Sequence, residues 1–420
     1  NNRYFADTIY FLLKKYCWNI PAATNENYPI SSLFEHSKIT AAISWCFKVF
    51  KEETEDGFQP YLKGEKLKLN KGQLPLLLLC VDLSGIQKFI YNISSKYAAK
   101  CLRGRSFYLQ MMLQDIAREI LHRTGAYYSN IVYSSGGKLF MLLPNTTKIK
   151  NIIKEFENEL LKNIWIKYNG EIFVCIGTIA FAYDNDIKDE TKPRLWIEDY
   201  DTPQYFSELW KCAIEKASSK KNKRFSNIFL TEEGYNNFFI PTGVGGKTQI
   251  CAVTGRELIE KLDLEVIVDE NEEKITVSKE VYEQKIIGEE LPGHSYIVFG
   301  LENSFLKEKV VPLITKHKLH IGNKKEDLNI KNSELFFTLK NNEPDFLPKN
   351  INNNLYGFQY FGGTSYPTNN KNNVKTFEDL AEDSPVNKIG FLRMDVDFLG
   401  NLFIYGFKTE IEKNGKIYIR

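Results

Sequence analysis

The chain has 420 residues, of which 43% are hydrophobic and 14% aromatic, and its formal net charge is +2. Because single hydrophobic cores stop growing at roughly 250 residues, we expect two or three domains. The small net charge excludes a polycation, so a nucleic-acid surface would have to come from local clusters of basic residues. No apolar run reaches the ~20 residues of a membrane span, which predicts a soluble protein.

The cysteines indicate a reducing compartment. All seven are scattered singly, without a Cys-x-x-Cys pair, and the chain starts without a secretory signal. This pattern predicts a cytoplasmic protein with free, mostly buried thiols. Because the sequence starts at Asn1 without methionine and stops at Arg420 directly after a strand-like segment, we interpret both ends as truncations.

The first 50 residues predict helices, because apolar side chains recur at three- and four-residue spacing on both sides of a turn at Pro21. A polar segment rich in glycine and lysine follows at 51–72 and predicts a linker.

Residues 73–240 predict a ferredoxin-like palm domain. The apolar run 74–81 indicates a buried strand, and a helical pattern follows it. Two apolar segments around Gly136 and Gly137 then predict a hairpin, followed by another helix and a strand at 172–181. This βαββαβ order is that of the ferredoxin-like fold.

The remaining residues predict three further regions. Residues 241–294 are charged and read as a linker or insert, and 295–386 as a mixed region with asparagine- and glycine-rich loops. Residues 387–420 predict the start of a second palm, because the strand-like segment 388–394 ends in Asp395 and echoes the earlier strand that ends in Asp82. The predicted fold class is α+β.

The two carboxylates of the second palm are the candidate catalytic residues. In palm-type nucleotidyltransferases, strand-end and hairpin carboxylates hold metal ions that align a triphosphate with the attacking hydroxyl. Asp395 and Asp397 are placed for this role, with Asp395 the stronger metal-ligand candidate. A strand-end turn or a helix cap would explain both aspartates as well. In the first palm the hairpin tip at Gly136 and Gly137 carries no carboxylate, which predicts binding or shaping and not catalysis there.

Two long segments resemble a known family. Residues 82–91 (DLSGIQKFIY) and 98–108 (AAKCLRGRSFY) are similar to the first palm of the large subunit of type III-A (Csm) CRISPR effector complexes. Residues 134–144, 223–226 and 391–400 resemble its Gly-Gly hairpin, its post-palm segment and the opening of its second palm. Residues 18–21 and 33–42 resemble the last part of its HD nuclease domain, so the resemblance covers roughly residues 10–407.

Two departures from the family pattern limit what the resemblance implies. None of the five histidines precedes an aspartate, and His36 is the single remnant of the HD site, which argues against single-strand DNA cleavage by this chain. Cys251 stands alone where the family carries a cysteine-rich zinc insert. Because tetrahedral zinc requires four ligands, we expect no zinc.

The resemblance implies an antiviral, RNA-guided effector subunit that binds ATP and Mg²⁺ or Mn²⁺. On recognition of target RNA, such a subunit makes cyclic oligoadenylate if its second palm is complete. The implied partners are CRISPR RNA, target RNA and neighbouring subunits, especially the one that holds the 5′ end of the guide. Two alternatives remain open: a non-catalytic scaffold of the same complex, and a stand-alone palm-type nucleotide cyclase.

The first palm supplies the remaining candidate residues. Ser84, Gly136 and Gly137 are predicted to bind nucleotide, since glycine lets the backbone approach a ligand closely, although a plain hairpin turn explains the glycines equally well. A basic cluster is predicted to contact RNA or ATP phosphates, with a solvated helix face as the alternative; its members are Lys100, Arg103 and Arg105.

Overall fold

The computed structural model describes most of the chain. The described residues are 2–23, 31–54, 73–93, 98–184, 194–239, 249–258, 264–268, 274–301, 310–322, 332–338, 354–359, 367–368, 375, 377–390, 392, 410–413 and 416–419. The predicted linker at 51–72 therefore lies largely outside the described residues.

Two helices form the N-terminal region, as the apolar spacing predicts. Helix α1 spans Asn2–Cys17 and α2 spans Leu33–Glu53. Ser32 caps α2, because its side-chain oxygen accepts the backbone N–H of Glu35 at 3.1 Å. Pro21 pairs with Ser32 in an isolated β-bridge, which closes the turn between the helices.

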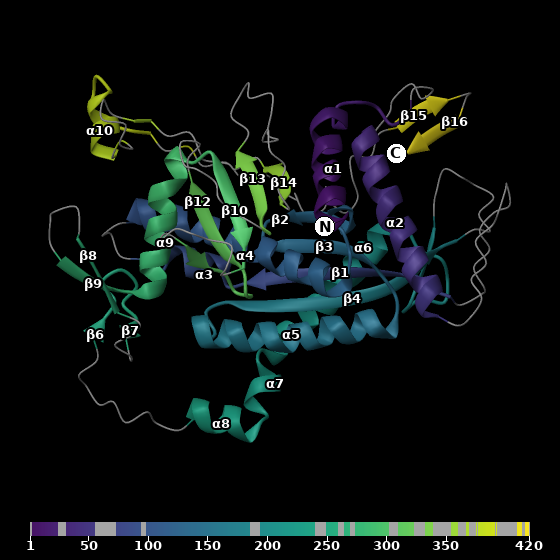
Figure 1. Ribbon diagram of the computed structural model, residues 1–420, viewed down its shortest axis with the longest axis horizontal. Coiled ribbons are helices and arrows are strands. Elements are labelled where there is room, and N and C mark those ends of the chain that lie inside the picture. Colours follow the sequence, from purple (N-terminus) through teal and green to yellow (C-terminus); the bar gives the residue numbers. More distant parts are fainter. Residues whose placement is uncertain are drawn as a thin grey trace.

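The first sheet contains the predicted βαββαβ order. Its elements are β1 (Leu76–Ser84), α3 (Ile86–Tyr91), α4 (Ala98–Thr124), β2 (Ile131–Ser135), β3 (Lys138–Pro144), α5 (Thr147–Tyr168) and β4 (Phe173–Tyr183), with β5 (Leu195–Ile197) added at the edge. The strand order is β2-β3-β1-β4-β5, and all pairs are antiparallel. Strand β1 is buried along nearly its whole length, because helices cover the sheet on both faces (Figure 1).

Short helices follow the first sheet. Helix α6 (Phe206–Ser219) packs across β1 and β4 and continues into the 3₁₀ turn η2 (Lys220–Lys223). Helices α7 (Ser226–Phe229) and α8 (Glu232–Phe239) form a pair that projects below α5 in Figure 1.

The region predicted as a linker or insert is folded wherever it is described. It forms the hairpins β6 (Gln249–Ile250) with β7 (Glu257–Leu258) and β8 (Leu264–Val268) with β9 (Lys274–Ser278), followed by α9 (Lys279–Glu290). Helix α9 lies directly against α4. A Cβ added to Gly104 would lie 1.8 Å from the Gln284 carbonyl oxygen, so only glycine permits this approach. Of the two alternatives, the described residues favour an insert.

A second sheet contains five strands. They are β10 (Tyr296–Gly300), β11 (Val311–Pro312), β12 (Lys318–Gly322), β13 (Glu334–Thr338) and β14 (Leu355–Gln359), in the order β11-β12-β10-β13-β14. All pairs are antiparallel except β13 with β14. One continuous core of buried side chains joins this sheet to the first sheet and to α1. The fold is thus mixed α+β with mainly antiparallel sheets, as expected.

The C-terminal part is described only in pieces, namely α10 (Phe377–Glu382), β15 (Glu410–Lys413) and β16 (Lys416–Ile419). The strand predicted at 388–394 is not seen in its described part, since residues 388–390 and 392 lie outside any strand. A strand requires a hydrogen-bonding partner, and no strand in the described ranges pairs with this segment. None of the described helices has both the length and the apolarity required to cross a membrane.

Candidate functional site

The end of β1 brings together an aspartate and two lysines. Asp82 lies opposite Lys138 of β3 and Cys175 of β4 in the sheet register. Its Oδ1 is 3.4 Å from Nζ of Lys138, and its Oδ2 is 2.7 Å from Nζ of Lys221 in η2. Asp82 is buried, whereas both ammonium groups retain contact with solvent. The carboxylate is therefore neutralised from both sides.

This arrangement does not fit a divalent metal ion at the first sheet. Mg²⁺ and Mn²⁺ bind carboxylate oxygens directly, but both oxygens of Asp82 face a lysine ammonium group. The adjacent hairpin contributes Lys138 where a second carboxylate would be required. No group of three or more His, Cys, Asp or Glu side chains suited to a metal lies anywhere in the described ranges.

The tip of the β2–β3 hairpin lies close to the end of β1. Gly136 and Gly137 both have positive φ angles, of 59° and 78°, as a tight hairpin turn requires. The Leu83 N–H donates to the Gly137 carbonyl at 2.8 Å, and a Cβ on Gly137 would lie 2.4 Å from Ile86 Cδ1. Gly136 is exposed, and a Cβ added to it would meet nothing within 4 Å, while Ser84 is half-buried at the end of β1. Gly137 therefore serves packing, whereas Gly136 borders open space.

Helix α6 covers one face of the same sheet. A Cβ on Gly177 of β4 would lie 2.3 Å from the Ala217 backbone nitrogen, so the helix backbone rests directly on the strand. Trp210 of α6 stacks on Phe140 of β3, with ring centroids 3.7 Å apart. Since η2 continues from α6, this packing also delivers Lys221 to Asp82.

The predicted basic cluster is engaged with α9. Nζ of Lys100 is 3.4 Å from Glu289, and Arg103 donates to the Gly288 carbonyl at 2.7 Å. Arg105 is only 2% exposed. Its guanidinium donates to Gln284 Oε1 at 2.8 Å and to the carbonyls of Phe89 and Asn92. In this structure Arg105 therefore connects α3, α4 and α9, and an RNA contact would require these bonds to break.

The remaining predicted site residues are His36, Cys251, Asp395 and Asp397. His36 is exposed on α2, away from any metal-binding group of described residues. Cys251 is buried and accepts the backbone N–H of Ser278 at 3.4 Å. Asp395 and Asp397 lie outside the described residues.

Sequence reasoning missed the two lysine partners of Asp82. Lys138 could have been found in part, because it directly follows the Gly-Gly turn and therefore starts β3. Its place opposite Asp82 comes from the pairing of β3 with β1, which the βαββαβ order predicts. Lys221 could not, since it is far from Asp82 in sequence and only the packing of α6 brings it there.

Comparisons with known proteins agree on one family. The family described as Csm1 subunit domain B matches residues 75–238. A relative from Enterococcus italicus, the CRISPR system single-strand-specific deoxyribonuclease Cas10/Csm1 (subtype III-A), is 31% identical over 400 residues, which cover 93% of this chain and 47% of that protein. The chain thus spans about half the length of this relative.

Two solved structures have a similar fold. Crystal structures of a Csm1-Csm4 cassette in complex with one ATP and of a Csm1-Csm4 cassette in complex with cA4 match with TM-scores of 0.59 and 0.58. Each match has 19% sequence identity and covers 90% of this chain and 41% of the other.

Proposed function

The chain belongs to the Cas10/Csm1 family of subtype III-A CRISPR systems, and on that premise we propose that it acts in the large subunit of an RNA-guided antiviral effector complex. The proposed activity is binding of ATP and its conversion to cyclic oligoadenylate when target RNA is recognised. The observation that carries the proposal is the match along 93% of the chain to a subtype III-A relative. The fold shared with cassettes that hold ATP and cA4 supports the nucleotide part.

The proposal divides the work between the two palms. The first palm, 73–240, binds and shapes, because the charge of Asp82 is neutralised by Lys138 and Lys221. Asp395, with Asp397 as a companion, is proposed to hold the divalent cation in the second palm, where the metal would align the triphosphate with the attacking hydroxyl. Gly136 and Ser84 are proposed to border the nucleotide, since Gly136 is exposed in the β2–β3 turn and Ser84 is partly exposed at the end of β1.

The proposed partners are CRISPR RNA, target RNA and a Csm4-type subunit. The partner subunit is suggested by the fold shared with Csm1-Csm4 cassettes. Guide sequence would be read by base pairing, with the protein contacting backbone and shape. Among the basic residues, Lys100 and Arg103 are the better candidates for phosphate contact, because Arg105 is buried.

Sequencing the RNA that copurifies with the natively expressed protein tests the assignment. The expected result is a population of short RNAs that share one repeat-derived 5′ end. A well-folded protein that carries no such RNA would contradict the assignment and favour a stand-alone nucleotide cyclase.

A pair of matched substitutions tests the division of work. In the natively assembled complex, with ATP and target RNA, Asp395→Asn is expected to lower cyclic oligoadenylate formation by about a hundredfold or more, because it removes a proposed metal ligand. Asp82→Asn is expected to leave the rate within about twofold, since Asp82 holds no metal in the proposal. The product is quantified by chromatography, and the opposite order of effects would overturn the division.

The second candidate function is a non-catalytic scaffold in the same complex. It is favoured by the two lysines at Asp82 and by the isolated, exposed position of His36. The scaffold predicts guide RNA in the complex but no oligoadenylate from ATP, with or without Asp395. Under either function we expect this chain not to cleave single-stranded DNA, which a labelled oligonucleotide with Mn²⁺ would test.

A further inference from the structure

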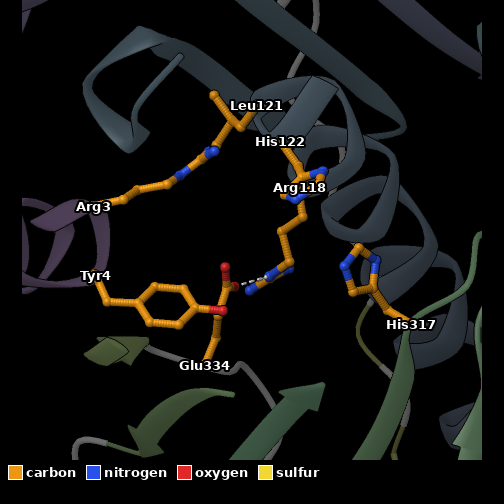
Figure 2. Close-up of a pocket in the computed structure, with 7 residues that line it drawn as sticks. All are labelled: Arg3, Tyr4, Arg118, Leu121, His122, His317 and Glu334. Carbon is orange, nitrogen blue, oxygen red and sulfur yellow. Dashed lines mark hydrogen bonds and ion pairs between the residues drawn. The ribbon is translucent and has the colours of Figure 1, made fainter. Parts of the chain in front are cut away.

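A polar cavity lies between α1, α4 and the second sheet (Figure 2). Its volume is about 270 Å³, and its polar lining consists of Arg3, Tyr4, Arg118, His122, His317 and Glu334. The lining comes from four separate parts of the chain, and it includes none of the residues assigned to the proposed function. The volume is several times the ~30 Å³ that one water molecule occupies.

Arg118 is a fixed donor in this cavity. The residue is 4% exposed, and its guanidinium carbon lies 3.5 Å from the centroid of the Phe299 ring. Nε is bound to Glu334 Oε2 at 2.5 Å, and Nη1 donates to Gln114 at 3.3 Å. Nη2 is buried and makes no hydrogen bond to any described residue. Because an unsatisfied buried charged donor is costly, this nitrogen points to a missing acceptor.

Further donors face the same space. Figure 2 shows Arg3 and Tyr4 extending from α1 toward α4. Burial raises the pKa of Tyr4, so its hydroxyl keeps its proton, and burial lowers the pKa of His122, so its ring is neutral near pH 7. His317 is oriented by Asp115, whose Oδ1 lies 2.9 Å from the ring nitrogen Nδ1.

The charges of the lining favour an anion. Two guanidinium groups and one carboxylate, that of Glu334, line the cavity. Arg3 also donates through Nη2 to the Ala126 carbonyl at 2.7 Å, and its Nε lies 3.8 Å from Asp7 behind the lining. Arg118 therefore carries most of the excess positive charge. This carboxylate is already bound by Arg118 Nε and by the Tyr128 hydroxyl at 2.7 Å, which reduces its repulsion of a ligand. Guanidinium groups match the geometry of tetrahedral oxyanions.

We propose that this cavity binds a phosphate group, with Arg118 Nη2 and Arg3 as its principal donors. The phosphate group is either free inorganic phosphate or the terminal group of a mononucleotide, and the cavity has room for an attached group. Binding would join α1 to α4 and β13, since Arg3, Arg118 and Glu334 come from these three elements.

Calorimetric titration of the 420-residue chain tests the proposal, with inorganic phosphate and adenosine 5′-monophosphate as separate probes at constant ionic strength. We expect saturable binding that weakens about tenfold in Arg118→Gln and in Arg3→Gln, as expected for loss of a charged hydrogen bond. Arg194→Gln removes the same charge from an exposed position outside the cavity and is the matched control. Arg3 is partly exposed, so Arg3→Gln decides the question if Arg118→Gln does not fold.

Each outcome decides one point. Loss of binding in Arg3→Gln with retention in Arg194→Gln supports the site; tighter binding of the mononucleotide then assigns a nucleotide ligand, and equal binding assigns free phosphate. Absence of saturable binding for both probes overturns the proposal. Equal weakening in Arg3→Gln and Arg194→Gln also overturns it, because the effect would then be general electrostatics.

Discussion

The two five-stranded sheets hold helix α4 in different ways. Helix α4 contributes apolar side chains such as Met112 and Ile116 to the continuous core that contains the first sheet. Toward the second sheet it adds polar contacts: Asp115 accepts the Thr315 N–H at 2.8 Å, and Arg118 is bound to Glu334. Apolar burial is non-directional, whereas hydrogen bonds between buried polar groups fix one geometry. The comparison indicates that apolar burial of α4 supplies stability, and that its polar contacts with the second-sheet region fix the orientation of the helix.

Breaking the polar contact should have the largest effect. Arg118→Met keeps the apolar stem but leaves Glu334 without its cation, so we expect the free energy of unfolding to fall by about 3–5 kcal/mol. Denaturant unfolding followed by circular dichroism measures the loss. The control Lys211→Met, which removes an exposed ion pair with Glu208, should cost less than about 1 kcal/mol. A loss in Arg118→Met as small as in this control would contradict the assigned role.

Truncation in the apolar layers should come next. Leu79→Ala in β1 removes a fully buried side chain and is expected to cost about 3 kcal/mol, through lost burial and the cavity left behind. Ile297→Ala in β10 is the matched change in the second sheet, since Ile297 is also 0% exposed. If denaturant unfolding shows similar losses of unfolding free energy for both variants, the two sheets differ in their polar contacts and not in their apolar packing. A negligible loss for Ile297→Ala would show that the second sheet adds little stability.

A pH-dependent effect on the free energy of unfolding is expected at Asp7 of α1. Burial raises the pKa of Asp7 to about 7, although its carboxylate accepts the Tyr128 N–H and lies 3.8 Å from Arg3. Because the folded-state pKa exceeds the unfolded value near 3.8, Asp7 destabilises the fold increasingly as pH rises from about 4 to 7. Asp7→Asn should therefore gain about 1 kcal/mol or more relative to wild type between pH 4 and pH 8. Unfolding free energies of both proteins across this range are the measurement, and a constant difference would refute the prediction.

The smallest effect is expected at the end of β1. Asp82→Asn should lower the free energy of unfolding by only about 1 kcal/mol, because Lys138 and Lys221 both reach solvent and can be hydrated when the charge is lost. The double variant Lys138→Met with Lys221→Met is the counterpart, and it should cost more, since it leaves a buried carboxylate unpaired. Thermal unfolding of both variants tests the order, and equal losses would argue against the charge-neutralised site.

Local sequence pattern was enough to predict the first sheet and the family resemblance. Strand β1 is a continuous apolar run, and the two glycines mark the turn of the β2–β3 hairpin, so the local pattern sufficed to place these strands. The resemblance rested on equally local segments such as 82–91, and the comparisons confirm it. Apolar periodicity and turn chemistry act over a few residues, which is why a sequence reveals them.

The roles of the charged residues depend on long-range packing and could not be predicted from local pattern. Arg105 belongs to the basic cluster for which a solvated helix face is the alternative, and Arg118 follows on the same helix, yet both are buried on partners from distant segments. Asp82 is similar, since its partner Lys221 arrives through the packing of α6. The physical reason is that burying a charge requires a specific partner, and a partner more than a hundred residues away leaves no periodic signal beside the charge itself.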